Sequence, residues 1–468
     1  MCVRLTVAKP QLVVWLERER QQKESIDLEN TSNSKHYHRL LCFNLQCQCI
    51  ACFRRSNMTR SLRKSPLKKN LYKQYIDYSL QLNRWFLKPI GIWPTSTSKE
   101  KMLSRGIQFI CYSLIAFTVI PSVLYIFLED QDVDIRVKAI GPVSHWFMGA
   151  MNYLSLLLRG DEIRRCIKHM EVDWQLVSRV QDREMMLRNA KLGRFIAGFC
   201  AVFMHCGVFS YSMIKSMSPL IIVMGNQTVA IPRLPCPFYS NFLDTTVRLT
   251  NQIVLMIQFL SGFIVNSITV GACSLAAVFA MHACGQFSVL FLWLNELVGD
   301  DTEKRDKLVK YKLANIVQHH LRVLSFVSCI EQVMYQICLV QLVGCTLNMC
   351  MIGYYSITEW DTEDTKNLVT YGILFASMTF NIFIFCYIGE LLSEQCKKVG
   401  ETAYLTEWYR LPQKTALSLV LIISRSSAVI KMTAGKLIEL SLATFGDVSL
   451  DSYEVIYTLL FAQKTLIY

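Results

Sequence analysis

Long uncharged apolar runs alternate with short charged connections along this chain. A helix needs about 20 apolar residues to cross the hydrocarbon core of a bilayer, and six runs reach that length without interruption. A seventh apolar region follows them toward the C-terminus. The pattern predicts an all-α membrane protein with seven transmembrane helices. We expect spans at about residues 107–127, 139–158, 195–214, 254–279, 332–355, 367–389 and 437–462.

The seventh region is predicted to be split. Its apolar residues begin at 416–424, but Arg425, Lys431 and Lys436 interrupt them before they resume. Charged breaks at membrane depth are tolerated only against protein or water. We therefore expect a cytosolic helix, a break near Gly435 and then the spanning helix.

Charge indicates the orientation. Of the 468 residues, 52% are hydrophobic and 18% charged, which excludes a typical soluble protein. Residues 1–105 hold 20 Lys and Arg against 7 Asp and Glu, which suggests a basic cytoplasmic arm. With seven spans, the connections on the N-terminal side carry 19 Lys and Arg and the opposite ones carry 6. The positive-inside rule then places the N-terminus in the cytoplasm and the C-terminus outside.

The alternation of sides also decides how many times the fourth apolar run crosses the membrane. No Asp, Glu, Lys or Arg lies between Arg248 and Glu296, so two crossings are conceivable there, but the alternation of sides favours one.

The basic arm favours contact with anionic membrane lipid rather than nucleic acid. Asn226 begins an Asn-Gln-Thr sequon on a connection predicted to face outward, which makes it a candidate glycosylation site.

No motif indicates an enzyme or a transporter. The sequence has no HExxH, no nucleotide loop of the Walker type and no evident inverted repeat. Its 18 cysteines lie mostly inside apolar stretches. The one cluster, Cys42, Cys47, Cys49 and Cys52, lacks His partners at ligand spacing, so acylation or coincidence is favoured over metal binding. We expect no catalytic residue, no metal and no cofactor.

Specific sequence patterns occur near the start of the apolar region and in the C-terminal third. The first is Leu80–Trp85, continuing through Lys88–Pro94. The second is more distinctive. It comprises Cys386–Glu390, Gln395, Val399-Gly400, Ala403-Tyr404, Trp408-Tyr409, Leu411-Pro412, Arg425–Ser427, Thr433–Lys436 and Ser452-Tyr453.

These residues resemble the ligand-tuning subunits of the insect odorant receptor family, in particular those of ants, bees and wasps. The resemblance covers roughly residues 75–465, which implies a seven-helix receptor domain at 75–468 after a basic, poorly ordered extension at 1–74. It implies the inverted topology that charge predicts. It also implies a hetero-tetramer with the odorant receptor co-receptor, because the second intracellular connection lacks the long insert of the co-receptor itself.

The resemblance further implies a ligand-gated, non-selective cation channel in the plasma membrane of olfactory neuron dendrites. Its ligand would be a small volatile or cuticular hydrophobic compound. The alternative is a metabotropic receptor that signals through a G protein. The inverted topology disfavours that reading, and the sequence has neither a DRY triplet after the third span nor NPxxY in the seventh.

The family places its ligand in the outer half of the bundle, and several residues map there. An odorant site should be apolar with one or two orienting polar groups. His145 and His205 are the most informative, although a neutral His bonded to a backbone carbonyl is an equal alternative for each. Most of the others can equally be packing residues. The candidates are Ser144, His145, Met148, Met204, His205, Val208, Phe209, Met256, Phe259 and Tyr371.

Two further sets follow from the resemblance. Ser452, Ile456 and Leu460 would line the pore or its gate, and Trp408, Tyr409 and Pro412 would anchor the subunits to one another in the cytosol. An alternative for the pore is the face that carries Asp447, Asp451 and Glu454, since these follow at spacings of four and three. At 100° per residue both faces cannot line one pore on a straight helix. The family assignment is preferred.

Overall fold

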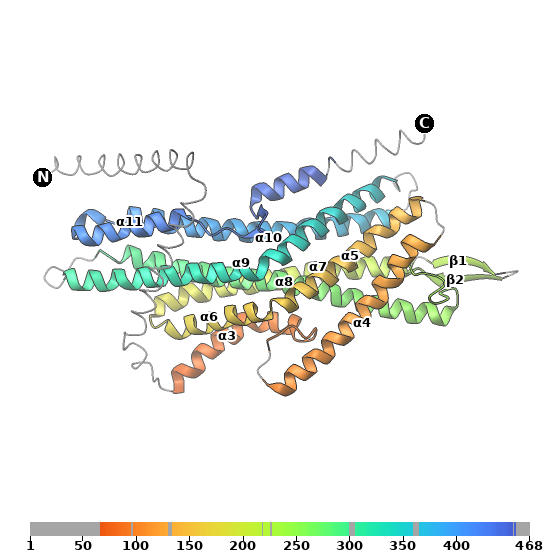
Figure 1. Ribbon diagram of the computed structural model, residues 1–468, viewed down its shortest axis with the longest axis horizontal. Helices are drawn as coiled ribbons and strands as arrows, with labels where there is room; N and C mark the ends of the chain where they lie inside the picture. Colours follow the sequence, from red (N-terminus) through yellow and green to blue (C-terminus); the bar gives the residue numbers. More distant parts are fainter. Residues whose placement is uncertain are drawn as a thin grey trace, which may run out of the picture. The chain divides into compact units, whose positions relative to one another are not determined.

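The computed structural model describes residues 66–94, 97–129, 133–217, 219–224, 227–298, 305–358, 365–452 and 454. Contacts separate Met1–Asn70 from Leu71–Tyr468 as two units, and the sites discussed below belong to the second. The elements in chain order are α3 (Pro66–Leu87), α4 (Ser98–Leu128), α5 (Val133–Leu158), α6 (Gly160–Leu176), α7 (Val180–Met217), β1 (Pro219–Met224), β2 (Gln227–Pro232), α8 (Arg248–Asn295), α9 (Arg305–Thr358), α10 (Thr365–Leu405), η4 (Trp408–Arg410), α11 (Gln413–Ser427), β3 (Thr433–Ala434) and β4 (Ile438–Glu439) (Figure 1).

The chain is a mostly helical membrane protein, as its apolar runs predict. Among the described residues, five helices are long and apolar enough to cross a bilayer. These are Ser98–Leu128, Val180–Met217, Arg248–Asn295, Leu308–Thr358 and Leu368–Leu405. The predicted span 139–158 also forms a helix, α5, but Ser144, His145 and Asn152 lower its hydropathy. The last described helix, residues 442–452, continues into residues outside the description.

The fourth apolar run forms one continuous helix rather than two. At a rise of 1.5 Å per residue, the 48 residues of α8 extend about 72 Å, more than twice the thickness of a bilayer core of about 30 Å. Nearly every side chain between Ile264 and Leu290 is buried, because α4, α5, α7, α9 and α10 all pack against this helix. A helix that is apolar on every face belongs in such a central position.

Small residues allow α7 and α8 to approach closely along their length (Figure 1). A Cβ atom added at Gly193 of α7 would lie 3.1 Å from Met281 Cβ, and one at Gly285 of α8 would lie 3.3 Å from the Cα atom of Met186. Close backbone approach at Gly is the usual way that membrane helices pack without a hydrophobic driving force.

Local signals set the start of α4. Thr97 caps the helix by accepting from the backbone N–H of Glu100, whose side chain returns to the N–H of Thr97 in a capping box. The preceding turn uses Gly91 with a φ of 73°, a conformation that Gly adopts without strain. The carbonyl of Gly91 accepts hydrogen bonds from Ser104 and Gln108 of α4, which fixes the turn on that helix.

Candidate functional site

Ser144 and Met148, two of the predicted ligand residues, face α9 from α5. The hydroxyl of Ser144 lies 2.8 Å from the carbonyl oxygen of Gly141 and 3.0 Å from Oδ1 of Asn348. Met148 is buried, and its Sδ packs on Gly344, where an added Cβ would lie only 2.3 Å from that sulfur. The two helices therefore meet through a polar pair and a close apolar contact one turn apart.

Tyr371, the predicted ligand residue on α10, also borders α9. It is buried, and its ring centroid lies 6.0 Å from that of Tyr355. The hydroxyl of Tyr355 accepts from the N–H of Gly141 at 3.1 Å and donates to the carbonyl of Val137 at 2.9 Å. These bonds connect the first turns of α5 to the end of α9, with the Tyr371 ring beside them.

The helix α9 contacts three of the predicted ligand residues, but the sequence alone does not single it out. Asn348 and Tyr355 carry the polar contacts to Ser144 and Gly141. The only sequence signal for Asn348 is a polar amide inside an apolar run. Which face of a helix that amide occupies depends on contacts with helices about 200 residues away in the chain, and the run itself does not encode them.

His145 is partly buried, and its two ring nitrogens are buried without a hydrogen-bond partner among the described residues. Its ring lies edge-on to Trp146, with centroids 5.7 Å apart. Trp146 is held in turn by a 3.0 Å bond from its Nε1 to the hydroxyl of Ser261 on α8. Buried polar atoms are nearly always paired, so the two ring nitrogens of His145 are available to a ligand or to water.

His205 is different, because both of its ring nitrogens have partners. Nδ1 lies 2.9 Å from the carbonyl oxygen of Ala201, which can only accept, so Nδ1 carries a proton. Nε2 lies 3.3 Å from the hydroxyl of Ser267 on α8, and the ring packs beside Phe263. His205 therefore has the geometry of the alternative given above, a histidine bonded to a neighbouring backbone carbonyl.

The remaining predicted ligand residues are not brought into one group. Met204 is buried in the apolar core, and Val208 and Phe259 are partly buried. Phe209 and Met256 are 62% and 69% exposed. Their helices carry them to the surface of the described chain, where lipid is the expected neighbour of such apolar side chains.

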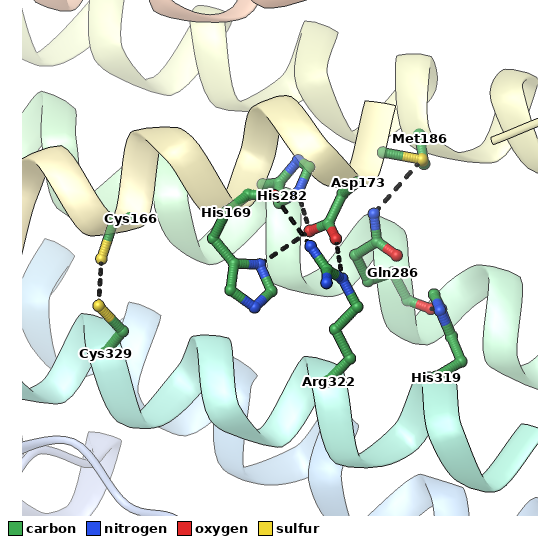
Figure 2. A network of polar contacts seen from close by, with 9 residues as sticks. All are labelled: Cys166, His169, Asp173, Met186, His282, Gln286, His319, Arg322 and Cys329. Atoms are coloured by element: carbon green, nitrogen blue, oxygen red, sulfur yellow. Dashed lines mark hydrogen bonds and ion pairs between the residues drawn. The ribbon is translucent and has the colours of Figure 1, made fainter. Parts of the chain in front are cut away.

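A buried charge network joins α6, α8 and α9 (Figure 2). Oδ2 of Asp173 lies 3.2 Å from Nδ1 of His169 and 2.9 Å from Nε2 of His282. Oδ1 accepts from Nε of Arg322. Burial alone would raise the pKa of Asp173, but the hydrogen bonds from His169 and His282 and the charge of Arg322 outweigh it and hold that pKa well below its usual range. His282, the one ionisable residue in the charge-free run of α8, is the sequence signal for this network.

The break near Gly435 is present, and it forms a small hairpin clamped on α9. We call this segment, Thr433–Glu439, the joint. β3 and β4 pair antiparallel across Gly435 and Lys436, whose φ angles are 64° and 62°. The carboxylate of Glu331 accepts from both the backbone N–H and the hydroxyl of Thr433, and the N–H of Gly435 donates to the carbonyl of Tyr335 at 2.7 Å. The predicted anchor helix is therefore connected to the last helix through fixed contacts with α9.

Several residues of α10 that carried the family resemblance pack closely on the chain that follows the joint or on α11. A Cβ at Gly389 of α10 would lie 2.3 Å from the carbonyl oxygen of Leu440, and Glu390 accepts from the N–H of Leu442 at 3.3 Å. Closer to the chain's anchor region, a Cβ at Gly400 would lie 2.2 Å from Oγ of Ser426 on α11. Each Gly is required because another backbone or side chain occupies the position of its missing Cβ.

Arg159 extends these contacts to the end of α5. Its guanidinium donates to the hydroxyl of Tyr335 and to Oε1 of Gln336, the latter at 3.1 Å. It also lies 4.8 Å from the centroid of the Tyr335 ring, and Nζ of Lys436 lies 4.9 Å from the same centroid. The Tyr335 side chain thus contacts both the C-terminal end of α5 and the joint.

The predicted pore and anchor residues are placed only in part. Ser452 is buried, and its hydroxyl donates to the carbonyl of Val448 at 2.7 Å. Asp447, Asp451 and Glu454 are exposed. Ile456, Leu460 and the predicted glycosylation site Asn226 lie outside the described residues.

The predicted anchor residues all lie around the connection from α10 to α11. Trp408 and Tyr409 belong to the short helix η4, with ring centroids 6.2 Å apart, and Pro412 precedes the first turn of α11. Trp408 packs against the core, whereas Tyr409 is 54% exposed. Tyr409 is therefore the anchor residue with the most surface open to another molecule.

Comparisons with known proteins agree on one family. A family model described as 7tm Odorant receptor matches residues 135–450. Odorant receptor 13a of Drosophila melanogaster is 22% identical over 346 residues, which cover 69% of this chain and 78% of that receptor. The odorant receptor coreceptor of Aedes aegypti is 23% identical over 147 residues, which cover 31% of this chain and 30% of that protein.

Solved structures share the fold. The insect olfactory receptor OR5 from Machilis hrabei matches with a TM-score of 0.67 at 14% identity, over 83% of this chain and 99% of that chain. The same receptor in complex with eugenol matches with a TM-score of 0.66 at 13% identity.

Proposed function

The chain belongs to the odorant receptor family, and on that premise we propose that it is the ligand-sensing subunit of a heteromeric, ligand-gated, non-selective cation channel. It works with the odorant receptor co-receptor in a hetero-tetramer, in the plasma membrane of olfactory neuron dendrites. The similarity to a mosquito coreceptor supports a common channel architecture. The asymmetry of Lys and Arg between connections supports seven spans with a cytoplasmic N-terminus, in which residues 1–74 form a basic extension and 75–468 the receptor domain.

The ligand site that we propose lies where α5 and α10 both pack against α9. The observation that carries it is the pair of buried ring nitrogens of His145, which have no partner among the described residues. Ser144, Met148 and Tyr371 border the same helices. One orienting polar group among apolar and aromatic side chains suits a small volatile or cuticular compound. The eugenol complex of a receptor with this fold supports a ligand of that size.

The conduction path is proposed to run along the last helix, on the face that carries Asp447 and Asp451 rather than on the face that Ser452, Ile456 and Leu460 share. Because Ser452 is buried within the chain, it is not on the open face of this helix. The exposed carboxylates Asp447 and Asp451 lie on that open face. If that open face lines the path between subunits, these carboxylates would concentrate cations near its mouth. This reverses the preference for Ser452 that the family resemblance suggests.

Ligand binding is proposed to reach the last helix through α5, α9 and the joint. Arg159 at the end of α5 contacts Tyr335 of α9, and Tyr335 contacts both Gly435 and Lys436. A ligand that contacts α5 and α9 differently in two arrangements of these helices shifts the population between them. The contacts at the joint would then differ between the closed and the open arrangement.

The test is whole-cell current from cells that express this chain with and without the co-receptor, against a panel of general odorants and cuticular hydrocarbons. Current that needs both subunits and survives blockade of G proteins supports the channel. Current that the blockade abolishes supports the metabotropic alternative instead. A C-terminal tag that antibody reaches only after permeabilisation would refute the inverted topology.

A further inference from the structure

Two thiols from different helices face each other beside the charge network (Figure 2). Sγ of Cys166 on α6 lies 2.9 Å from Sγ of Cys329 on α9, and both cysteines are free. A covalent disulfide has an S–S distance of about 2.05 Å, so a movement of roughly 1 Å would join them. The pair belongs to neither the proposed ligand site nor the joint.

The two sulfurs differ in their access to a reagent. Cys166 has 0% of its surface exposed, whereas Cys329 is partly exposed. A reagent from solution therefore meets Cys329 first, and Cys166 is held behind it. This arrangement is that of an attacked thiol with a resolving thiol next to it.

Charged side chains of both signs lie beside the pair. Glu162 is the one carboxylate of its ion-pair cluster, and it contacts two guanidinium groups. Nη2 of Arg165 lies 3.1 Å from it and Nη1 of Arg159 lies 4.0 Å from it. The Cys166 thiol donates to the Cys329 sulfur at 2.9 Å, and this hydrogen bond favours the thiolate at Cys329, which is the reactive form of cysteine.

We propose that Cys166 and Cys329 form a redox-active dithiol site whose oxidant is hydrogen peroxide. The Cys329 thiolate attacks one peroxide oxygen, which breaks the O–O bond, gives a sulfenic acid at Cys329 and releases hydroxide. The Cys166 thiol then attacks the Cys329 sulfur and forms the S–S bond. The sulfenic oxygen leaves as hydroxide, which takes up the proton of the Cys166 thiol to become water. Overall, two thiols and one peroxide give one disulfide and two waters, and a dithiol reductant reverses the change.

The disulfide fixes α6 to α9 close to the joint. Cys329 precedes Tyr335 by six residues, which is about 9 Å along the helix, and Arg159 directly precedes α6. In the proposed orientation α6 lies on the cytoplasmic side, where cysteines are kept reduced and disulfides are transient. The expected effect on current rests on the proposed function. Oxidation holds α6 and α9 in one arrangement and so reduces the ligand-evoked current.

The chemical test uses the full-length chain in intact cells and needs no odorant. Cells are treated with hydrogen peroxide, remaining thiols are blocked with N-ethylmaleimide, and the protein is digested without reductant for mass spectrometry. We expect a peptide that links Cys166 to Cys329, which grows with peroxide and disappears with dithiothreitol. Cys206, an exposed free cysteine on α7, is the internal control and should form no such link.

Variants separate the two roles. In Cys166→Ser the linked peptide is absent, and the sulfenic acid at Cys329 persists and is trapped by dimedone. In Cys329→Ser neither product forms. If these variants fail to fold, phenylarsine oxide on the unmodified chain replaces them, since it bridges adjacent dithiols and should protect both cysteines from N-ethylmaleimide together.

Two results would overturn the proposal: no peptide linking Cys166 to Cys329 after peroxide treatment, or linkage of Cys329 to a cysteine other than Cys166. A linked peptide with no ligand-evoked current at all would leave the dithiol site standing and count against the proposed function.

Discussion

Thr433 donates both its backbone N–H and its hydroxyl to the carboxylate of Glu331, which lies 102 residues earlier in the chain. This contact connects α9 to the segment between α11 and the last helix. The neighbouring bond from Gly435 N–H to the Tyr335 carbonyl follows one turn further along α9. The joint is thus held by α9 at two successive turns, and α9 is also the helix that borders the proposed ligand site.

Replacing Thr433 tests the strength of this contact. Thr433→Val keeps the shape of the side chain and the backbone bond but removes the hydroxyl that donates to Glu331. Hydrogen bonds to charged groups contribute about 1.5–3 kcal/mol, so we expect a lower unfolding temperature of the detergent-solubilised receptor. Thr433→Ser keeps the hydroxyl and should melt close to the original chain. Equal melting of the Val and Ser variants would mean that the hydroxyl contributes nothing.

Two glycines of α10 form a matched pair. At Gly389 an added methyl group would collide with the Leu440 carbonyl oxygen at 2.3 Å, whereas at Gly372 there is nothing within 4 Å. Gly389→Ala should cost about 1–3 kcal/mol through overpacking and reduce delivery to the cell surface. Gly372→Ala should be neutral or stabilising by up to about 1 kcal/mol. Surface biotinylation of both variants checks this, and equal surface levels would contradict the close packing of Leu440 on α10.

The Asp173 network predicts a large loss from a small change. Asp173→Asn removes the charge that pairs with Arg322, whose side chain is 26% exposed. Breaking a buried pair costs about 3–5 kcal/mol, and the partial exposure of Arg322 places the loss near the lower end. The control is Glu296→Gln, which breaks the exposed pair with Arg179 and should cost less than about 1 kcal/mol. Thermal melting of both variants distinguishes them, and similar losses would show that the network is not a stabilising centre.

The sign of the pH effect follows from the direction of the Asp173 shift. Its pKa is lower in the folded chain than the value of about 3.9 in an unfolded one. Its contribution to stability is therefore present above the unfolded pKa and is lost as pH falls through the folded pKa. The network should weaken only in strong acid, and Asp173 itself adds no pH dependence near neutrality.

The two histidines should separate ligand sensitivity from stability. His145→Phe removes the unpaired imidazole, so we expect a rise of about fivefold in the half-maximal odorant concentration, equivalent to the loss of one hydrogen bond of about 1 kcal/mol, with little change in melting. His205→Phe removes bonds to Ala201 and Ser267, and we expect lower stability with unchanged sensitivity. Dose–response curves and melting of both variants give the comparison. The reverse assignment would move the ligand site toward His205.

Sequence patterns predict the parts of this molecule that depend on neighbours along the chain. The charged interruptions around Gly435 indicate the break before the last helix, because hydropathy and backbone preference act locally. The charge-free run of α8 likewise predicts one apolar spanning helix. Neither signal gives the rotation of one helix against another.

Long-range contacts therefore remain outside the reach of the sequence. Nothing near Gly389 indicates that Leu440 occupies the space beside it, and nothing near Asp173 indicates that Arg322 faces it from α9. The same holds for Ser452, whose burial against the rest of the chain depends on how the last helix is rotated. Family resemblance identified many residues of the joint without giving their contacts.

The central claim is that a ligand opens a channel formed by this chain and the co-receptor without a soluble messenger. Recording from excised outside-out patches tests it most directly, with GTP absent and with the compound that gives the largest whole-cell current in the panel. We predict ligand-evoked, non-selective cation currents in patches from cells that express both subunits, and none from cells that express this chain alone. Currents that vanish on excision and return only with GTP would contradict the account.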